Sequence, residues 1–369
     1  MLQAIFHAWE QRLASATTDR VVRPFEWGLD WVDGEGKASI FAPGSADRCA
    51  TTRSDVESIG HASTPADRLS AWVSNVMEDT DAFYRPAPCD DYVLGDLIDG
   101  EQLLTFPSAL HTPHPENNTV YGRLFHARDR GTRAHRAAVV VLPQWNADAG
   151  GHVGLSKLLT MHGLTALRMS LPYHDRRMPP ELHRADYIVS ANVMRTLQVC
   201  RQAVLDARRA IAWLHAQGYD RIGMLGSSLG SCLSLLTTAH EPLVYAQALN
   251  HISPYFADVV WRGISTSHVR EGLDGHIELD LLRRLWDPIS PSNFVERLRD
   301  RKTLLVYARY DLTFPVDLSR ELVRQFEAQG IPHEVMVLRC GHYTTGVAPF
   351  KFVDGWVLSR FLRRALLND

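Results

Sequence analysis

Several features that would mark a secreted, membrane-spanning or nucleic-acid-binding protein are missing from this sequence of 369 residues. It has only five cysteines, scattered and without a C-x-x-C pair, which argues against a disulfide framework and a zinc ribbon and favours a reducing compartment. It has no apolar run of the eighteen or so residues that a membrane-spanning helix requires. The formal net charge is only -3, so no general basic field favours nucleic acid.

The start of the chain also lacks the pattern of a secretory signal peptide. There is no basic first region, and His7 and Glu10 interrupt the apolar stretch. We therefore expect a cytoplasmic protein. With 45% hydrophobic and 22% charged residues, the composition is that of a globular protein with one large core and an appendage.

The most informative segment is Gly226 to Gly230, which reads G-x-S-x-G around Ser228. It follows a short apolar run typical of a strand and precedes an apolar segment typical of a helix. A serine hydroxyl stands clear of a sheet edge only where the chain turns sharply, and side chains at the flanking positions would collide with neighbouring elements. This setting favours Ser228 as a nucleophile over a noncatalytic tight turn, with Ser227 as the fallback.

Two further candidates follow later apolar runs. Asp311 comes just after the run at 303–308, and His342 comes after the run at 334–338. A serine nucleophile needs a base within reach, and the base needs an orienting carboxylate. His342 is our candidate base and Asp311 our candidate acid. Asp317 competes, but it opens the next predicted helix, where an acidic residue needs no catalytic explanation.

From about residue 92 onward, the order of serine, acid and histidine, each beyond a predicted strand, resembles the α/β-hydrolase superfamily. The resemblance implies an α/β fold with a doubly wound, mostly parallel sheet, and a serine hydrolase that cleaves carboxylic esters through an acyl-serine intermediate. A narrower similarity is to the group of α/β-hydrolase domain-containing protein 18. It depends on the Leu-Pro-Tyr loop at 171–173, the helix end at 215–219 and the Gly-Met-Leu-Gly segment at 223–226.

The apolar patterns predict a helical N-terminal extension over residues 1–90 and an α/β-hydrolase domain over 91–369. Beyond an antiparallel start, strands and helices alternate, which indicates parallel crossovers. We expect helices at 2–13, 66–77 and 192–218, a loop or weakly ordered linker at 42–64, and strands at 103–106, 120–126, 137–142, 163–169, 243–249, 303–308 and 334–338.

An insertion at 251–301 interrupts this alternation, and its helical apolar stripe ends near Trp286. In the superfamily that the chain resembles, such an insertion usually forms a cap over the nucleophile. We expect a helical cap here that excludes water and offers an apolar wall to an acyl chain. The alternative is a segment that only covers an edge of the sheet.

The resemblance also implies an oxyanion hole of two backbone N–H donors. Leu229, the residue after the nucleophile, is the first candidate. Trp145, in the loop after the strand at 137–142, is the second. Many relatives carry His-Gly before this donor, whereas this chain has Pro143-Gln144, which leaves the positions on either side of Trp145 open.

Charged residues gather in the loop at 171–179. Arg176 or Arg177 could pair with an anionic substrate group, although a network of arginine and aspartate that holds the loop is the simpler interpretation. His174 and Asp175 lack a third ligand at matching spacing, so we expect no metal. We expect no cofactor either.

The expected partner is a small-molecule ester, with no nucleic acid and no membrane-spanning segment. A peptidase or an acyltransferase of the same fold is the enzymatic alternative, and the absence of a propeller domain argues against the peptidase. A noncatalytic binding module is the other alternative, and the presence of all three triad residue types argues against it. The natural substrate, the acyl length and the oligomeric state stay open.

Overall fold

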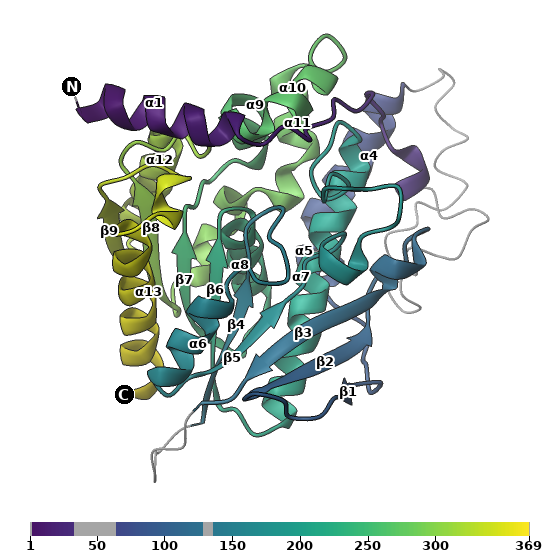
Figure 1. The fold of residues 1–369 in the computed structure, drawn as a ribbon. Coiled ribbons are helices and arrows are strands. Elements are labelled where there is room, and N and C mark those ends of the chain that lie inside the picture. Colours follow the sequence, from purple (N-terminus) through teal and green to yellow (C-terminus); the bar gives the residue numbers. More distant parts are fainter. Residues whose placement is uncertain (1, 33–63, 128–135, 369) are drawn as a thin grey trace.

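The structure, a computed structural model, describes residues 2–32, 64–127 and 136–368 (Figure 1). The linker expected at 42–64 therefore lies outside the described residues, except for Thr64 at its end. Thr64 caps the following helix, because its hydroxyl accepts the backbone N–H of Asp67 and the Asp67 carboxylate accepts the N–H of Thr64 in return.

In the described part of the chain, nine strands form one sheet in the order β1-β2-β3-β5-β4-β6-β7-β8-β9. The strands β1 to β3 are antiparallel to their neighbours, and β4 to β9 are parallel to theirs, apart from the antiparallel pair β3 and β5. The predicted doubly wound, mostly parallel sheet with an antiparallel start is confirmed. The strands are β1 Val93–Leu94, β2 Glu101–Pro107, β3 Thr119–Phe125, β4 Ala137–Leu142, β5 Thr165–Met169, β6 Arg221–Ser227, β7 Val244–Asn250, β8 Lys302–Ala308 and β9 Glu334–Leu338.

The central strand β4 is buried on both faces because helices cover both sides of the sheet. Val140 packs into one hydrophobic core, whereas Val139 and Val141 pack into a second core on the opposite face. The first core contains α7 and α8, and the second contains α13. A strand enclosed in this way reads as a continuous apolar run, which is the pattern found at 137–142.

The helices agree closely with the periodic segments of the sequence. The long helix expected at 192–218 is α7, and the Asn192 side chain caps its start by accepting the backbone N–H of Arg195. The α-helices are α1 Leu2–Ser15, α4 Pro65–Glu78, α5 Thr80–Phe83, α6 Val153–Met161, α7 Val193–Ala216, α8 Leu229–His240, α9 Phe256–Arg262, α10 Ser267–Leu273, α11 Leu279–Leu285, α12 Val316–Ala328 and α13 Phe350–Leu367. The 3-10 helices are η1 Leu29–Trp31, η2 Pro115–Asn118, η3 Asp175–Arg177, η4 Ile264–Thr266, η5 Asp287–Ile289, η6 Pro291–Leu298 and η7 Thr344–Gly346. Across the described ranges, none of these helices has the length and apolar character that crossing a bilayer takes.

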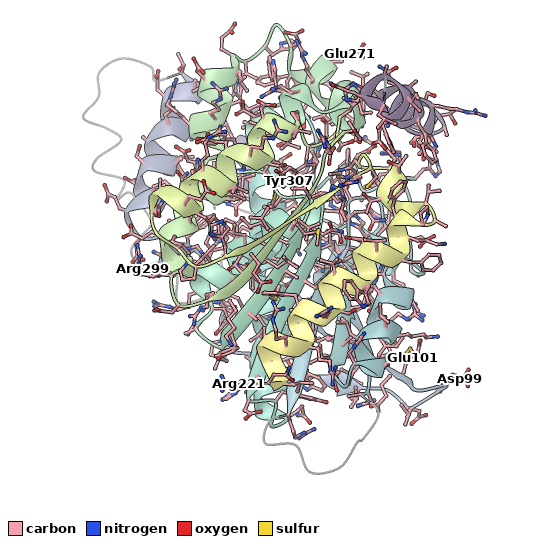
Figure 2. All side chains as sticks on the ribbon, turned by 90° about the vertical axis from the view of Figure 1, so that its left-hand side faces the viewer. Asp99, Glu101, Arg221, Glu271, Arg299 and Tyr307 are labelled. Atoms are coloured by element: carbon pink, nitrogen blue, oxygen red, sulfur yellow. The ribbon has the colours of Figure 1, made fainter. Side chains whose placement is uncertain are left out.

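The insertion lies beyond the end of the sheet to which the parallel strands point. In Figure 2, Arg221 at the start of β6 and Tyr307 near the end of β8 lie toward opposite ends of the sheet, and Glu271 of α10 lies beyond the Tyr307 end. The purple helix α1 crosses the same end of the molecule (Figure 1). Two segments far apart in the sequence therefore gather where the parallel strands end.

Candidate active site

The turn at Ser228 explains both glycines of the pentapeptide. Ser228 joins β6 to α8 with φ 55° and ψ -121°, a conformation that L residues rarely adopt. A Cβ at Gly226 would lie 2.1 Å from the carbonyl oxygen of Gly230, and a Cβ at Gly230 would lie 2.2 Å from that of Leu142. The sharp turn therefore depends on glycine at both positions, as the sequence indicated.

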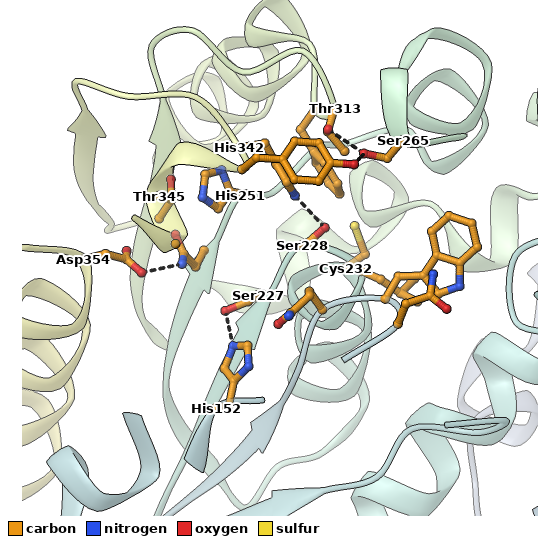
Figure 3. A pocket seen from close by; sticks show the side chains of 18 of the residues that line it. His152, Ser227, Ser228, Cys232, His251, Ser265, Thr313, His342, Thr345 and Asp354 are labelled. Carbon is orange, nitrogen blue, oxygen red and sulfur yellow. Dashed lines mark hydrogen bonds between the residues drawn. The ribbon is translucent and has the colours of Figure 1, made fainter. Parts of the chain in front are cut away.

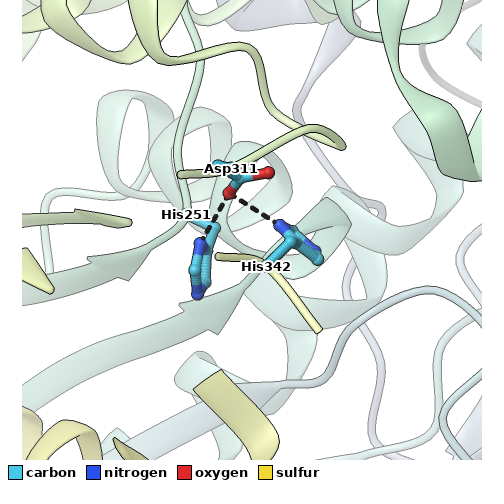
Figure 4. Close-up of side chains that lie close together, drawn as sticks. All are labelled: His251, Asp311 and His342. Carbon is cyan, nitrogen blue, oxygen red and sulfur yellow. Dashed lines mark hydrogen bonds and ion pairs between the residues drawn. The ribbon is translucent and has the colours of Figure 1, made fainter. Parts of the chain in front are cut away.

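The structure brings Ser228, His342 and Asp311 together in one hydrogen-bonded chain. The Ser228 hydroxyl lies 3.1 Å from His342 Nε2 (Figure 3), and His342 Nδ1 lies 2.9 Å from Asp311 Oδ2 (Figure 4). Asp317 takes no part, because it opens α12 and pairs with Arg262 at the surface. This geometry suits proton transfer from the serine to the imidazole.

The surroundings of Asp311 keep its carboxyl group ionised. Burial alone would raise its pKa, but the two neighbouring histidines and their hydrogen bonds hold the pKa well below its usual range. Its Oδ1 also accepts the backbone N–H groups of Thr313 and Phe314 at 2.8 Å and 2.7 Å. Burial would lower the pKa of His342, but the charge of Asp311 outweighs burial and raises it.

Sequence reasoning missed a second histidine on the same carboxylate. His251 Nδ1 lies 2.9 Å from Asp311 Oδ2, so the oxygen that serves His342 accepts from both rings (Figure 4). The three side chains offer atoms within 4.8 Å of one another, a spacing that a metal ion could use. In the structure both Nδ1 atoms are engaged with Asp311 instead. The sequence did contain a signal for this contact. His251 directly follows β7, so it lies at the same edge of the sheet as Asp311.

Ser227, the fallback nucleophile, has a histidine of its own. Its hydroxyl lies 2.8 Å from Nε2 of His152, the residue that precedes α6 (Figure 3). Burial, with a smaller contribution from the charge of Arg168, lowers the pKa of His152 to about 4, so the ring is neutral near pH 7. Among the described residues no carboxylate contacts this ring, so the pair lacks the orienting acid that His342 has.

Leu229 and Trp145, which carry the candidate oxyanion donors, both line a cavity of about 940 Å³ next to Ser228. The backbone N–H groups of Leu229 and Trp145 donate to no acceptor within the described ranges. Asn146, one of the neighbours left open, has its N–H engaged with His174 Nε2 at 2.9 Å. The alternatives for the second donor are thereby reduced to Trp145 and Gln144.

Apolar side chains from the insertion and from both faces of the sheet wall this cavity. The insertion contributes from α9, whereas α6 and α13 contribute from the other face of the sheet. Trp286, where the predicted apolar stripe ends, is not part of the wall: it is fully buried, and its Nε1–H donates to the carbonyl of Val193. The apolar lining from these elements consists of Phe256, Val259, Val260, Leu155, Leu158, Phe352 and Trp356.

The N-terminal helix contacts the loop that carries His342 through one carboxylate. Glu10 of α1 is fully buried, and its oxygens accept the backbone N–H groups of Tyr343 and Thr344, each at 2.9 Å. A Cβ at Gly341 would lie 2.3 Å from Glu10 Cδ, so the glycine before His342 leaves room for this carboxylate. The loop that carries His342 is therefore held from the far end of the chain.

The other charged candidates have structural partners. Arg177 is fully buried and pairs with Asp206 at 2.9 Å, which agrees with the interpretation that it holds its loop. Arg176 lies over the ring of Tyr121, and Asp175 pairs with Arg168. Neither arginine lines the cavity next to Ser228.

No protein-family model and no curated protein sequence matches this chain. Solved structures do match it. An acetyl xylan esterase from Paenibacillus is 15% identical, with 81% of this chain and 94% of that chain covered and a TM-score of 0.59. Acetyl xylan esterase 1 from Thermoanaerobacterium is 14% identical, with 80% and 93% covered and a TM-score of 0.55.

An acylaminoacyl peptidase from Pyrococcus horikoshii is also similar. It is 12% identical over 75% of this chain, with a TM-score of 0.56. The chain covers 41% of the length of that peptidase. At these identities the comparisons bear on the fold, and the chemistry has to be argued from the site.

Proposed function

Because the chain has the fold of the α/β-hydrolase superfamily, we propose that it is a serine hydrolase that cleaves carboxylic esters. The observation that carries this proposal is the hydrogen-bonded chain from Ser228 through His342 to Asp311, with the serine on a strained turn that faces the cavity. Two esterases among the similar structures support the choice of ester.

In the proposed reaction, Ser228 Oγ attacks the ester carbonyl carbon while His342 Nε2 takes the hydroxyl proton. The backbone N–H groups of Leu229 and Trp145 would stabilise the oxyanion that develops. His342 then returns the proton to the leaving alcohol, which leaves an acyl-serine. Water, activated by the same imidazole, hydrolyses the acyl-serine. Asp311 stays ionised throughout and stabilises the imidazolium.

The insertion at 251–301 acts as a cap in this proposal, and residues 1–90 act as an extension that completes the site. Support comes from the cavity lining, which includes Val260 of the insertion and Thr17 and Arg20 of the extension. Both segments would exclude water from the acyl-serine.

The two neighbouring serines provide a direct test. We expect Ser228→Ala to lower ester hydrolysis by about a million-fold, as loss of a triad nucleophile does in other serine enzymes. Ser227→Ala serves as the matched control and should keep covalent labelling by a fluorophosphonate, which Ser228→Ala should lose. If the Ser228→Ala protein is folded and keeps a tenth of the wild-type activity, the assignment is wrong.

A peptidase is the second candidate, because the acylaminoacyl peptidase shares the fold. The two activities separate on a matched pair of substrates with the same acyl group, one a p-nitrophenyl ester and one a p-nitroanilide. We expect turnover of the ester and little of the anilide. For each substrate, the enzymatic rate is divided by the rate of uncatalysed hydrolysis. A larger enhancement for the anilide than for the ester would favour the peptidase.

A further inference from the structure

Three hydroxyl groups meet on the wall of the cavity beside His342. Ser265 Oγ lies 2.7 Å from Thr313 Oγ1 and 2.8 Å from the hydroxyl of Tyr343 (Figure 3). The three residues belong to the insertion, the loop after β8 and the loop of His342, and all of them line the cavity. We call Ser265, Thr313 and Tyr343 the hydroxyl cluster.

A guanidinium group adjoins the hydroxyl cluster. Arg20 Nη2 donates to the Tyr343 hydroxyl at 3.2 Å, and Nη1 donates to the carbonyl of Ile264 at 3.3 Å. These contacts leave N–H groups unused, and the Nε atom of Arg20 is buried with no acceptor among the described residues.

Arg20 also lacks a balancing carboxylate. No acidic group in the described ranges lies within ion-pair distance of its guanidinium. Arg184, which lines the same cavity, differs in this respect, because it pairs with Asp19 at 2.9 Å and lies 3.6 Å from Asp186. Unbalanced positive charge in a mostly apolar cavity favours an anionic ligand.

The other charged residues of the lining do not balance Arg20. Arg184 pairs with Asp19 and Asp186, which leaves Lys351 as a further cation against Asp354, the one carboxylate in the described lining. Asp354 accepts a hydrogen bond from Asn250 Nδ2 at 2.9 Å and lies away from the hydroxyl cluster (Figure 3). It therefore offers Arg20 little compensation.

We propose that the substrate carries a carboxylate and that Arg20 and the hydroxyl cluster bind it; this rests on the ester hydrolase function proposed above. A guanidinium presents N–H groups in a planar fork that matches the two oxygens of a carboxylate, and a single cation balances a single negative charge. The three hydroxyls can rotate to donate to the same oxygens. The proposal narrows the substrate class from esters in general to esters with an acidic group.

Two matched pairs of esters test the proposal on the wild-type protein. One pair puts the charge on the alcohol portion, as 4-carboxyphenyl acetate against 4-carbamoylphenyl acetate. The other pair puts the charge on the acyl portion. It compares mono-4-nitrophenyl adipate, which has a free terminal carboxylate, with the same ester carrying a terminal carboxamide. In one of the pairs we expect the charged ester to have a kcat/KM about tenfold or more above the neutral one, the size expected for a charge-assisted hydrogen bond.

Variants of Arg20 then assign the preference. Arg20→Gln should reduce the ratio of charged to neutral kcat/KM to about one, and Arg20→Lys should keep part of it, because the charge stays while the planar fork is lost. Arg12→Gln is the matched control, since Arg12 makes the same charge change from the exposed side of α1 and does not line the cavity. It should leave the ratio unchanged.

The outcomes separate this proposal from the function on which it rests. Absence of turnover for all four esters would contradict the ester hydrolase itself. Turnover of the neutral esters without preference for the charged partners would overturn the carboxylate site alone. Equal loss of charged and neutral activity in Arg20→Gln would also overturn it, because it would mean that Arg20 only holds Tyr343 in place.

Discussion

At the scale of single residues, the two neighbouring serines differ in whether the histidine beside each one is bonded to a carboxylate. Ser228 faces His342, which is oriented by Asp311, whereas Ser227 faces His152, which no described carboxylate contacts. A neutral imidazole without an orienting acid can accept a proton but is not stabilised once it carries one. We therefore expect Ser228 to be the more reactive serine and expect this difference to depend on Asp311.

Replacing that carboxylate should be costly. We expect Asp311→Asn to lower kcat/KM by about ten-thousand-fold, because the imidazolium loses its partner and the ring is held in the wrong tautomer. Asp317→Asn is the control, since its carboxylate pairs with Arg262 at the surface. Ester kinetics on both purified variants check the prediction, and a greater loss in Asp317→Asn would contradict it.

The pH dependence should report His342. The imidazole must be neutral to accept the Ser228 proton, and the Asp311 carboxylate raises its pKa against the effect of burial. We therefore expect kcat/KM to rise with pH through an inflection above about 6.5, the ordinary histidine value. In Asp311→Asn the main attraction is gone, while burial and the smaller contribution of Glu10 remain, so the inflection of the residual activity should move to lower pH. An unchanged inflection would assign the titration to another group.

The proximity of Ser228, Asp311 and His342 was predictable from the sequence because each lies shortly after the end of a strand, and parallel strands bring their carboxyl ends to one edge. His152 was not, because it precedes a helix and reaches Ser227 from a position with φ 65° that no sequence pattern signals. The second oxyanion donor was only partly predictable, since the choice depends on which N–H in the loop is already engaged.

At the scale of elements, the periodicity that predicts α1 does not reveal what the helix does. Its apolar spacing indicates a packed helix, whereas its contact with the loop of His342 is made by Glu10, a residue that interrupts that spacing. The partners of Glu10 lie near the opposite end of the chain, and local patterns carry no signal for such a contact. Glu10 is a positioning residue in our account, acting through the loop of His342.

Glu10→Gln should therefore affect catalysis beyond its effect on stability. An amide replaces one acceptor oxygen by a donor that faces the N–H groups of Tyr343 and Thr344, which should cost about 1–3 kcal/mol of folding stability. Displacement of His342 should lower kcat/KM by about tenfold or more, since small misplacements at a reacting centre are costly.

Glu78→Gln makes the same charge change at the exposed end of α4 and is the control for Glu10→Gln. Thermal melts and ester kinetics on both variants separate stability from catalysis. Full activity in a destabilised Glu10→Gln protein would show that the loop keeps its position without the carboxylate.

At the scale of the whole molecule, the site lies where the sheet, the insertion and the N-terminal segment meet. The segments that follow the parallel strands carry Ser228, Asp311 and His342, while α9 of the insertion and the chain around Arg20 provide walls of the cavity. The alternation of strands and helices predicted the sheet, because local periodicity reflects burial on two faces. The wall residues were harder to predict, since Trp286 and Val260 are both hydrophobic and both buried, and only the packing places Val260 and not Trp286 beside the cavity.

The last prediction concerns which wall receives an acyl chain. We expect the chain to lie along α9, so Val260→Ala should lower kcat/KM for long acyl esters relative to acetate by about tenfold. The reason is that each lost methyl contact is worth about 0.8 kcal/mol, or about fourfold. Leu158→Ala removes contacts from the α6 wall and is the control. The measurement is kcat/KM against acyl length for p-nitrophenyl esters, with circular dichroism to confirm folding. A flatter profile in Leu158→Ala than in Val260→Ala would place the chain between α6 and α13 and leave α9 as a cover over the leaving group.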